Sequence, residues 1–381
     1  MDLICFCHIR WNFVYQRPQH LLTRFSHYHR VFIMEEPFYN QPETGYQVQI
    51  DPENQNLCVV SMKVSEEDTK NGGIHAIKNM IDSLMKIYSV KNLLLWYYSP
   101  MALAYSNHLI PLLTVYDCMD ELSAFRFAPP DIKEKEAELL KKADIVFTGG
   151  QSLYEAKKNL HANIHAFPSS IDKSHFSKAR LESKDADDQA AIPHPRFGFY
   201  GVVDERFDIV LLDEISRLKP QWHFIIIGPV VKIDPDTLPK RENIHYLGGK
   251  QYSELPLYLG NWDIAILPFA LNESTKYISP TKTPEYLAGG KPVISTSITD
   301  VVNPYGTMGL VKIADSAQEF IHAAETIFNE NDNSKSLWLK KTDEFLACNS
   351  WNKTWHKMNA IIEYALEKKK SKTIKTLKSY V

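Results

Sequence analysis

The sequence predicts an α/β protein built from two Rossmann-like, doubly wound domains that face each other across a cleft. Two observations predict this fold. Short continuous apolar runs alternate with helical patterns along most of the chain, which is typical of parallel sheets covered on both faces. The alternation stops at 178–195 and then resumes, so the 381 residues divide into two successive halves.

The first half reads as alternating strands and helices. The run Leu3-Ile4-Cys5-Phe6-Cys7 is a buried strand, and the pattern continues from there to residue 168. The segment 38–51 reads as a loop. We expect strands at 3–7, 31–34, 57–62, 93–97, 112–116, 144–148 and 165–168, and helices at 16–28, 74–88, 101–108, 131–143 and 151–160.

The second half repeats this organisation after 178–195, which is rich in charge and alanine and is expected to link the domains. We expect a first domain at 1–177, a second domain at 196–348, and a last helix and tail at 349–381 that cross back. The expected strands are 197–201, 222–227, 244–247, 264–267 and 292–294, and the expected helices are 207–218, 253–259, 282–288, 316–329, 334–348 and 351–370.

Composition excludes several classes of protein. A net charge of −3 argues against a general nucleic-acid binder. The five cysteines show no C-x-x-C spacing, which predicts neither disulfides nor a metal site and indicates a reducing compartment. A strand follows the first residues directly and no apolar run is long enough to span a bilayer, so we expect a cytoplasmic protein.

The segment 368–381 departs from the average, because it holds six lysines and no acidic residue. Such a tail can bind an anionic membrane surface, at roughly 1 kcal/mol for each lysine close to it. It can also be a solvated chain end. Peripheral contact with a membrane is therefore one of two interpretations.

The segment 272–296 organises the functional prediction. Its residues predict a loop, a helix start, a short helix, a Gly-Gly turn and a buried strand. With Thr281 as the N-cap, Pro284 takes the third helical position, where its missing N–H costs nothing. Ser279, Thr281, Lys282 and Thr283 would offer hydroxyls, an ammonium and free backbone N–H groups to an anion. Glu285 is placed to accept from sugar hydroxyls. The alternative is a capped helix with a solvated lysine.

Residues just beyond other strand ends extend this site, because ligands of such sheets bind at the carboxyl ends of the strands. Gly201 permits close backbone approach, and Arg206 can clamp a diphosphate or pair with Asp204 or Glu205. In the first half, a carboxylate is a candidate for a base or a turn former. The first-half candidates are His8, Arg10, Trp11, Gln16, Arg17, Asp117 and Asp120.

The sequence lacks the motifs of several other enzymes. No G-x-G-x-x-G follows the first strand, and neither a Walker loop nor H-E-x-x-H occurs. No nucleophile elbow is present. Dehydrogenase, kinase and hydrolase functions therefore lose support.

The motifs as a set resemble those of a known family. YGVVDERFDIVLL, IIIGP, NIHYLGG, ILPF and SPTKTPEYLAGGKPVIST resemble the donor half of GT-B glycosyltransferases of the family 1/family 4 group. WNFVYQRPQHLLTRF, VYDCMDELSAF and ADIVFTGGQSLYEAK resemble teichuronic-acid-type surface-polysaccharide transferases. The resemblance covers nearly the whole chain, from about residue 3 to residue 365.

The resemblance implies a role for each site residue. Glu285 would hold the ribose of a nucleotide sugar, Thr281 and Lys282 would contact its phosphates, and Arg206 would neutralise the leaving diphosphate. The loop at Leu247 and Gly248 would lie against the base. The expected donor is a UDP-sugar, the acceptor a glycan or lipid-linked glycan, and the configuration is retained. No metal or cofactor is required, since protein cations stabilise the diphosphate.

Two departures from the family pattern leave alternatives open. The first of the family's paired glutamates would fall at Tyr277, and the glycine loop after the first strand is replaced by 8–11. A nucleotide-sugar epimerase of the same fold would bind the same donor without an acceptor. A non-catalytic nucleotide-sugar-binding partner is the other alternative.

Overall fold

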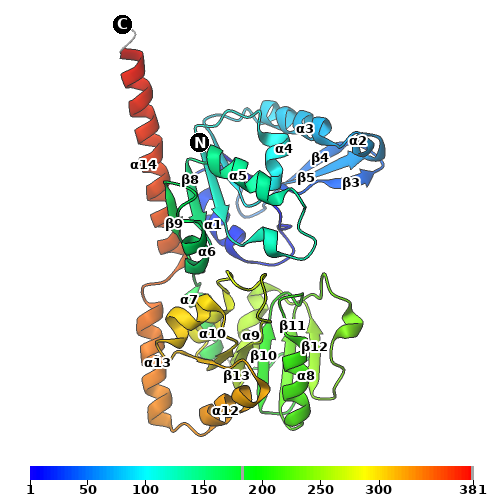
Figure 1. Cartoon of the computed structure of the whole chain (residues 1–381), viewed down its shortest axis with the longest axis vertical. Coiled ribbons are helices and arrows are strands. Elements are labelled where there is room, and N and C mark those ends of the chain that lie inside the picture. Colours follow the sequence, from blue (N-terminus) through cyan, green and yellow to red (C-terminus); the bar gives the residue numbers. More distant parts are fainter. Residues whose placement is uncertain (182–183, 379–381) are drawn as a thin grey trace.

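The computed structural model describes residues 1–181 and 184–378, with 372–378 described by their backbone alone. Figure 1 shows two α/β domains stacked along the long axis of the molecule, with the last helix running beside the upper one. Each domain contains one sheet with its own core. The predicted fold class is confirmed.

The N-terminal sheet is parallel apart from one edge strand. Its strand order is β3-β5-β2-β1-β6-β7-β8-β9, and β4 pairs with β5 in the antiparallel sense. From β1 the chain adds β2 and then β5 toward one edge of the sheet, and it later returns to place β6 on the other side of β1. The carboxyl ends of β1 and β6 therefore form the switch point of this sheet. The strands are β1 (Asp2–Cys7), β2 (Arg30–Glu35), β3 (Phe38–Gln41), β4 (Gly45–Ile50), β5 (Leu57–Ser65), β6 (Leu93–Tyr97), β7 (Leu113–Cys118), β8 (Ile145–Thr148) and β9 (Ile164–Ala166).

The prediction of a loop over 38–51 is wrong, because β3 and β4 occupy most of that segment. Tyr46, Val48 and Ile50 alternate with polar residues, which is the period of a half-buried strand. The prolines at 42 and 52 and the glycine at 45 obscured that pattern. Both strands are short, and they extend the edge of the sheet beyond β5.

The C-terminal sheet is fully parallel, with the order β12-β11-β10-β13-β14-β15. Its switch point lies between β10 and β13, where Gly201 and Pro268 follow the strand ends. The strands are β10 (Arg196–Tyr200), β11 (His223–Ile227), β12 (Ile244–Gly248), β13 (Ile264–Leu267), β14 (Val293–Ser295) and β15 (Val311–Ile313).

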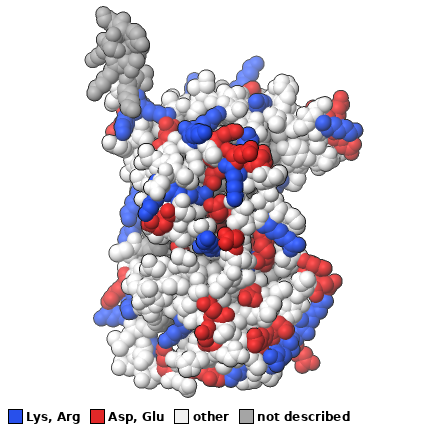
Figure 2. Space-filling model, viewed as in Figure 1, with Lys and Arg blue, Asp and Glu red and all other residues white. Residues whose placement is uncertain are grey.

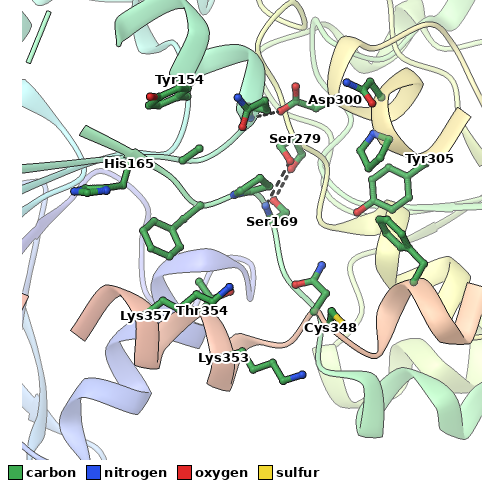
Figure 3. A pocket seen from close by; sticks show the side chains of 18 of the residues that line it. Tyr154, His165, Ser169, Ser279, Asp300, Tyr305, Cys348, Lys353, Thr354 and Lys357 are labelled. Carbon is green, nitrogen blue, oxygen red and sulfur yellow. Dashed lines mark hydrogen bonds between the residues drawn. The ribbon is translucent and has the colours of Figure 1, made fainter. Parts of the chain in front are cut away.

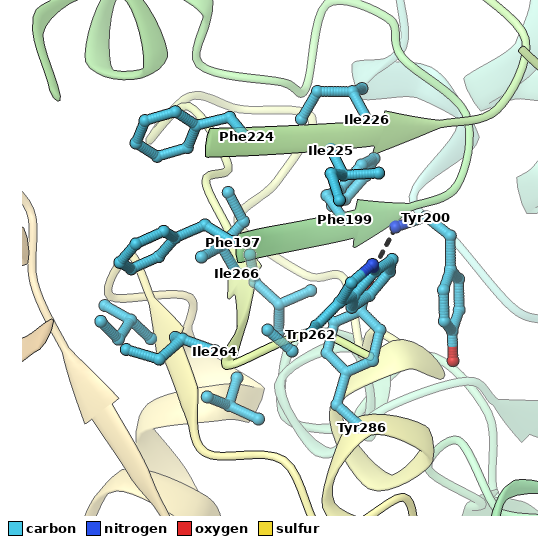
Figure 4. Close-up of a cluster of buried hydrophobic side chains, with 14 of the residues drawn as sticks. Phe197, Phe199, Tyr200, Phe224, Ile225, Ile226, Trp262, Ile264, Ile266 and Tyr286 are labelled. Carbon is cyan, nitrogen blue, oxygen red and sulfur yellow. Dashed lines mark hydrogen bonds between the residues drawn. The ribbon is translucent and has the colours of Figure 1, made fainter. Parts of the chain in front are cut away.

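Aromatic and β-branched side chains fill the core of this sheet (Figure 4). Trp262 is 1% exposed and lies over Gly198, where an added Cβ would meet the indole at 1.9 Å. The Tyr286 hydroxyl accepts from the Tyr200 backbone N–H at 3.0 Å, which ties helix α10 (Lys282–Ala288) to the end of β10. Core packing therefore fixes the helix that carries Lys282 and Glu285.

Helices connect the strands, as the alternating pattern predicts. Short 3-10 and π turns also occur: η1 (Pro100–Ala102), η2 (Leu122–Ala124), η3 (Ser177–Arg180), η4 (Pro235–Thr237), η5 (Tyr252–Glu254) and η6 (Val302–Gly306). The helices are α1 (Arg17–Ser26), α2 (Glu66–Lys70), α3 (Ile74–Ile87), α4 (Leu103–Ser106), α5 (Ile132–Lys142), α6 (Gln151–Lys157), α7 (Lys173–Phe176), α8 (Ile209–Leu218), α9 (Leu255–Gly260), α10 (Lys282–Ala288), α11 (Thr299–Val301), α12 (Ala317–Phe328), α13 (Asp332–Leu346) and α14 (Trp351–Lys378).

The chain passes between the domains at two adjacent places. Phe167 belongs to the N-terminal core and Ile171 to the C-terminal core. The second crossing lies between Leu346 and Trp351, and the Trp351 backbone N–H donates to the Ile171 carbonyl at 3.3 Å. Helix α14 thus packs on the N-terminal domain, as expected for a returning last helix.

The segment 178–195, expected as a linker, packs on the C-terminal domain in its described residues. Ala179, Ala186 and Ile192 are buried in the C-terminal core. Gln189 accepts from the Trp262 indole N–H at 2.8 Å, and Arg180 pairs with Asp343. This segment is anchored by burial that its charged and alanine-rich composition does not reveal, so it is not a free connection.

Polar contacts hold the domains together beside the two crossings. Asp300 of α11 accepts from the Gln151 and Ser152 backbone N–H groups, each at 2.9 Å, and so caps α6 of the other domain. Ser169 donates through its hydroxyl to the Ser279 carbonyl. These contacts place the pivot of any domain motion at the crossings.

Candidate active site

The site lies where the two switch points face each other. Loops after β10 and β13 meet through a bridge between Phe207 and Phe269, and Ala270 donates its N–H to the Arg206 carbonyl at 2.8 Å. Helix α10 begins at the same edge. Asp120, after β7, completes the opposite wall. Lys282 interacts electrostatically with Glu285, Arg206 and Asp120, so the structure brings these predicted residues together around Lys282.

Lys282 lies across the end of β10 because the residue there is glycine. Gly201 has φ 144°, and a Cβ on it would lie 2.1 Å from Cε of Lys282. Lys282 makes no ion pair with any described residue, and burial lowers its pKa while Glu285 counteracts this effect. An ammonium without a carboxylate partner, beside a bare backbone, is suited to a bound phosphate.

Glu285 lies one turn into α10 and is 5% exposed. It accepts a hydrogen bond from the Tyr200 hydroxyl at 2.8 Å. Burial raises the pKa of Glu285 to about 7, and Tyr200 and Lys282 partly oppose the rise. A buried carboxylate with one oxygen committed to Tyr200 can accept hydroxyl groups at the other.

Arg206 pairs with Asp204, which is one of the two roles expected from the sequence. Its Nε and Nη2 form a bidentate pair with Asp204, at 2.9 and 2.7 Å. Its guanidinium also lies 5.1 Å from the ring centroid of Phe125 of the N-terminal domain, and Lys232 lies 4.9 Å from the same ring. Arg206 Nη1 makes no hydrogen bond within the described chain, so the salt bridge orients the guanidinium and leaves a donor for a ligand.

Asp120 remains a candidate base. Burial raises its pKa to about 6, and Arg206 and Arg17 act in the opposite direction. Its carboxylate makes no hydrogen bond or ion pair among the described residues. A carboxyl group whose pKa lies near neutrality can exchange a proton with a substrate hydroxyl.

Most of the other first-half candidates serve the N-terminal domain itself. Glu35 accepts from Arg10 at 3.3 Å and from the Trp11 backbone N–H at 2.9 Å, and so fixes the loop after β1. Gln16 forms a capping box on α1. His8 stays neutral, because burial and then Lys232 lower its pKa to about 4, and its Nδ1 is buried without a partner among the described residues.

Arg17 and Asp117 lie inside the N-terminal domain rather than on the cleft wall. Their side chains are 3% and 0% exposed. Arg17 Nη2 donates to Asp117 at 2.8 Å, and its Nη1 donates to the Phe167 carbonyl at 2.7 Å. This pair joins α1, β7 and the first domain crossing. The acceptor-side role expected for both residues gives way to a structural one.

The remaining donor-site candidates are Ser279, Thr281, Thr283, Leu247 and Gly248. Thr281 is the N-cap of α10 without a side-chain capping bond, and the Thr283 hydroxyl is buried without a partner in the described chain. Ser279 is used in the contact with Ser169. Leu247 and Gly248 end β12, next to the switch-point loops, and Gly248 accepts from the Gly228 N–H at 2.8 Å.

A cavity of 610 Å³ lies at the domain crossings, apart from the charged cleft (Figure 3). It is lined by Ser169, Ser279, Asp300 and Tyr305 and by the start of α14. Figure 3 shows the Ser169–Ser279 contact on its wall. The cavity belongs to the pivot region, and it contains neither Lys282 nor Glu285.

The structure also bears on metal binding, on membrane-spanning helices and on surface charge. No group of histidine, cysteine or acidic residues in the described chain is arranged to hold a metal ion. Within the same residues, no helix has the length and apolar character needed to cross a bilayer. Acidic and basic residues are interspersed on the face in Figure 2. Of the lysine-rich tail, the side chains of 372–381 lie outside the described residues.

Several neighbours of the site escaped the sequence prediction. Tyr200 orients Glu285, and the Phe125 ring lies near Arg206 and Lys232 of the opposite domain. Tyr15 and Tyr252 meet across the domains at 4.4 Å. The sequence signal that could have found these residues is an aromatic residue at a strand end. Aromatic residues are also common in hydrophobic cores, so this signal does not single them out.

Two Rossmann-like domains with facing switch points define the GT-B class of proteins, and the cluster of charged residues around Lys282 agrees with it. Residues 194–330 match the family model of Glycosyl transferases group 1. The C-terminal domain therefore resembles the group 1 glycosyl transferases, as the sequence motifs indicated, and the whole chain has the GT-B fold.

Similar proteins support this assignment. The protein TuaH of Bacillus subtilis (strain 168), described as a teichuronic acid biosynthesis glycosyltransferase, is 26% identical over 57% of this chain and 59% of its own length. Sucrose-phosphate synthase of Thermosynechococcus elongatus superposes with a TM-score of 0.69 at 12% identity, over 96% of this chain and 99% of that one. HepE of Anabaena, in complex with UDP and glucose, gives 0.64 at 14% identity, over 95% and 99%. At these identities the structures show a shared fold.

Proposed function

We propose that the protein transfers a sugar from a nucleoside diphosphate sugar, with UDP as the expected nucleotide, to a glycan or lipid-linked acceptor in cell-surface polysaccharide synthesis. One observation carries this proposal: Lys282, which has no ion pair among the described residues, and the buried Glu285 lie on one helical turn, and Arg206 and Asp120 act electrostatically on Lys282. This arrangement offers cations to a diphosphate, a carboxylate to a ribose, and a second carboxylate to the reacting sugars.

Each residue then has a defined task. Lys282 and Arg206 Nη1 stabilise the charge that develops on the departing diphosphate, in a cleft where burial strengthens the interaction. The bond between the anomeric carbon and the diphosphate oxygen breaks, and its electron pair leaves with the diphosphate. The acceptor oxygen bonds to the same carbon, and its proton passes to Asp120. The family resemblance implies retention of configuration, which in a single step requires the acceptor oxygen to bond on the face of the sugar from which the diphosphate leaves.

The acceptor class rests on relatives. TuaH is described by its role in teichuronic acid synthesis, and WaaG, of the same fold with a TM-score of 0.63, by its role in lipopolysaccharide synthesis. Both products are surface glycans, which favours such an acceptor here. We place the reaction in the cytoplasm, with the lysine-rich tail able to contact an anionic membrane surface.

A thermal-shift comparison of UDP, GDP and ADP tests the donor site. We expect UDP at a hundred times its Kd to stabilise the fold by about 2.7 kcal/mol, with or without magnesium, because the cations are supplied by the protein. Release of UDP from a UDP-sugar in the presence of an acceptor glycan then measures transfer. If none of the three nucleotides stabilises the fold, the proposal is rejected.

Lys282→Ala separates the phosphate role from general folding. We expect the Kd for UDP to rise about tenfold, because a charge-assisted contact to the diphosphate is lost. Uridine, which lacks the diphosphate, should bind both forms equally. Lys276→Ala, an exposed lysine on the preceding loop, serves as the matched control. Calorimetry that gives the same UDP affinity for wild type and Lys282→Ala would contradict the assignment.

A further inference from the structure

A stack of three aromatic rings joins the two domains close to Glu285. Tyr252 of η5 lies between Tyr15, on the loop before α1, and His175 of α7. The ring centroids are 4.4 Å apart on both sides, with interplanar angles of 29° and 12°. Both faces of Tyr252 are therefore covered, one of them by a ring from the opposite domain.

The two covering rings are held differently. His175 belongs to the C-terminal side, where its Nε2 lies 2.9 Å from the Tyr252 carbonyl oxygen. Tyr15 comes from the N-terminal domain, and 43% of its side chain is exposed. The His175 face is part of a fixed wall. The Tyr15 face depends on the position of a surface loop and of the domain that carries it.

The stack continues directly to the proposed ribose site. The Phe176 ring lies 5.5 Å from Tyr252 and 6.2 Å from Tyr200, whose hydroxyl donates to Glu285. Burial raises the pKa of Tyr252, and the charge of Glu285 raises it further, which indicates that the two groups are close. The Tyr252 hydroxyl is buried without a partner among the described residues.

We propose that the base of the donor nucleotide stacks on Tyr252, in the place that the Tyr15 ring takes in this structure. This inference rests on the proposed function, because it takes the nucleoside diphosphate from there. A nucleobase is flat and of ring size, so it fits the same 4.4 Å stacking distance. The base is attached to the ribose, so a base on Tyr252 leaves the ribose hydroxyls within reach of Glu285.

The inference predicts opposite behaviour for two stacked tyrosines. Tyr252→Leu removes the platform and should raise the Kd for UDP by about tenfold to a hundredfold, the range of base–aromatic stacking. Tyr252→Phe keeps the ring and should stay within about threefold of wild type. Tyr15→Ala removes the competing ring, so UDP should bind equally well or several-fold more tightly. Titration calorimetry on the full chain measures all four affinities.

Inorganic diphosphate is the ligand control, since it has neither base nor ribose. Tyr252→Leu should bind it as wild type does, whereas a misfolded variant would bind neither ligand. An unchanged UDP affinity in Tyr252→Leu would overturn the stacking role. Equal weakening in Tyr15→Ala and Tyr252→Leu would overturn the displacement of Tyr15. If the wild type binds diphosphate, but binds no nucleoside diphosphate more tightly than diphosphate, the donor assignment itself is rejected.

Discussion

Asp117→Ala is expected to destabilise the N-terminal domain by about 3–5 kcal/mol, the usual cost of removing one partner of a buried ion pair. The Asp117 side chain is 0% exposed, and Arg17 would keep its charge in the interior without compensation. Arg17 also holds the Phe167 carbonyl at the first domain crossing. Disturbance there would reach the contact between the domains as well as the local packing. Urea unfolding followed by near-ultraviolet circular dichroism measures the loss.

A double variant tests whether the cost comes from the stranded charge. Arg17→Leu combined with Asp117→Ala removes both charges, so it should be more stable than Asp117→Ala alone by about 2 kcal/mol. A direct contact of Asp117 with the acceptor predicts a different pattern: little change in unfolding, with a raised KM for the acceptor. A double variant as unstable as the single one would mean that cavity formation, and not the unpaired guanidinium, sets the cost.

This pair shows what sequence alone could and could not supply. Asp117 was predicted to follow a strand at the cleft edge, whereas β7 (Leu113–Cys118) extends through it and its side chain is buried. Its direction was not predictable, because the partner Arg17 lies 100 residues earlier and only the folded sheet brings them together. The carboxylate of Asp120, three residues further along, makes no hydrogen bond or ion pair among the described residues, and Arg206 and Lys282 act on it electrostatically. A shift of three residues separates a structural carboxylate from a candidate catalytic one.

Local signals fixed the donor half better. Thr281, Lys282 and Pro284 specify the start of α10, and the helix begins where they predict. Gly201 was expected to permit a close approach, and the group that approaches it is Lys282. The aromatic partners were out of reach of such reasoning. Tyr15 and Tyr252 belong to different domains, and no sequence pattern near either residue indicates that they are in contact. The strands at 38–41 and 45–50 were missed because edge strands carry few buried residues.

Glu285→Gln is expected to stabilise the C-terminal domain at pH 8 while it weakens the donor site. Burial raises the pKa of Glu285 from 4.5 to about 7. The unfolded carboxyl loses its proton near its ordinary value, so the folded state binds the proton more tightly. The stability that this group contributes is thus fully present below about pH 4.5 and is lost as pH rises through about 7. Glutamine carries no ionisation and keeps the oxygen that accepts from Tyr200.

The difference between the variant and wild type should therefore grow with pH. We expect near equality at pH 4.5 and a gain approaching about 3 kcal/mol at pH 8, which follows from 1.36 kcal/mol for each unit of pKa. Glu344→Gln, an exposed glutamate of α13, should show no such trend. The Kd for UDP at pH 8 should rise about tenfold, because the ribose hydroxyls lose an ionised acceptor.

Thermal unfolding between pH 4.5 and 8, with and without UDP, measures both effects in one series. A stability gain that does not change with pH would show that the pKa of Glu285 is the same in the folded and the unfolded state. Unchanged UDP affinity alongside the expected gain would leave Glu285 as a strained residue without a ligand. Gain and loss together have one explanation: the helix that carries Lys282 is kept less stable than it can be, because a buried carboxylate is needed where the ribose binds.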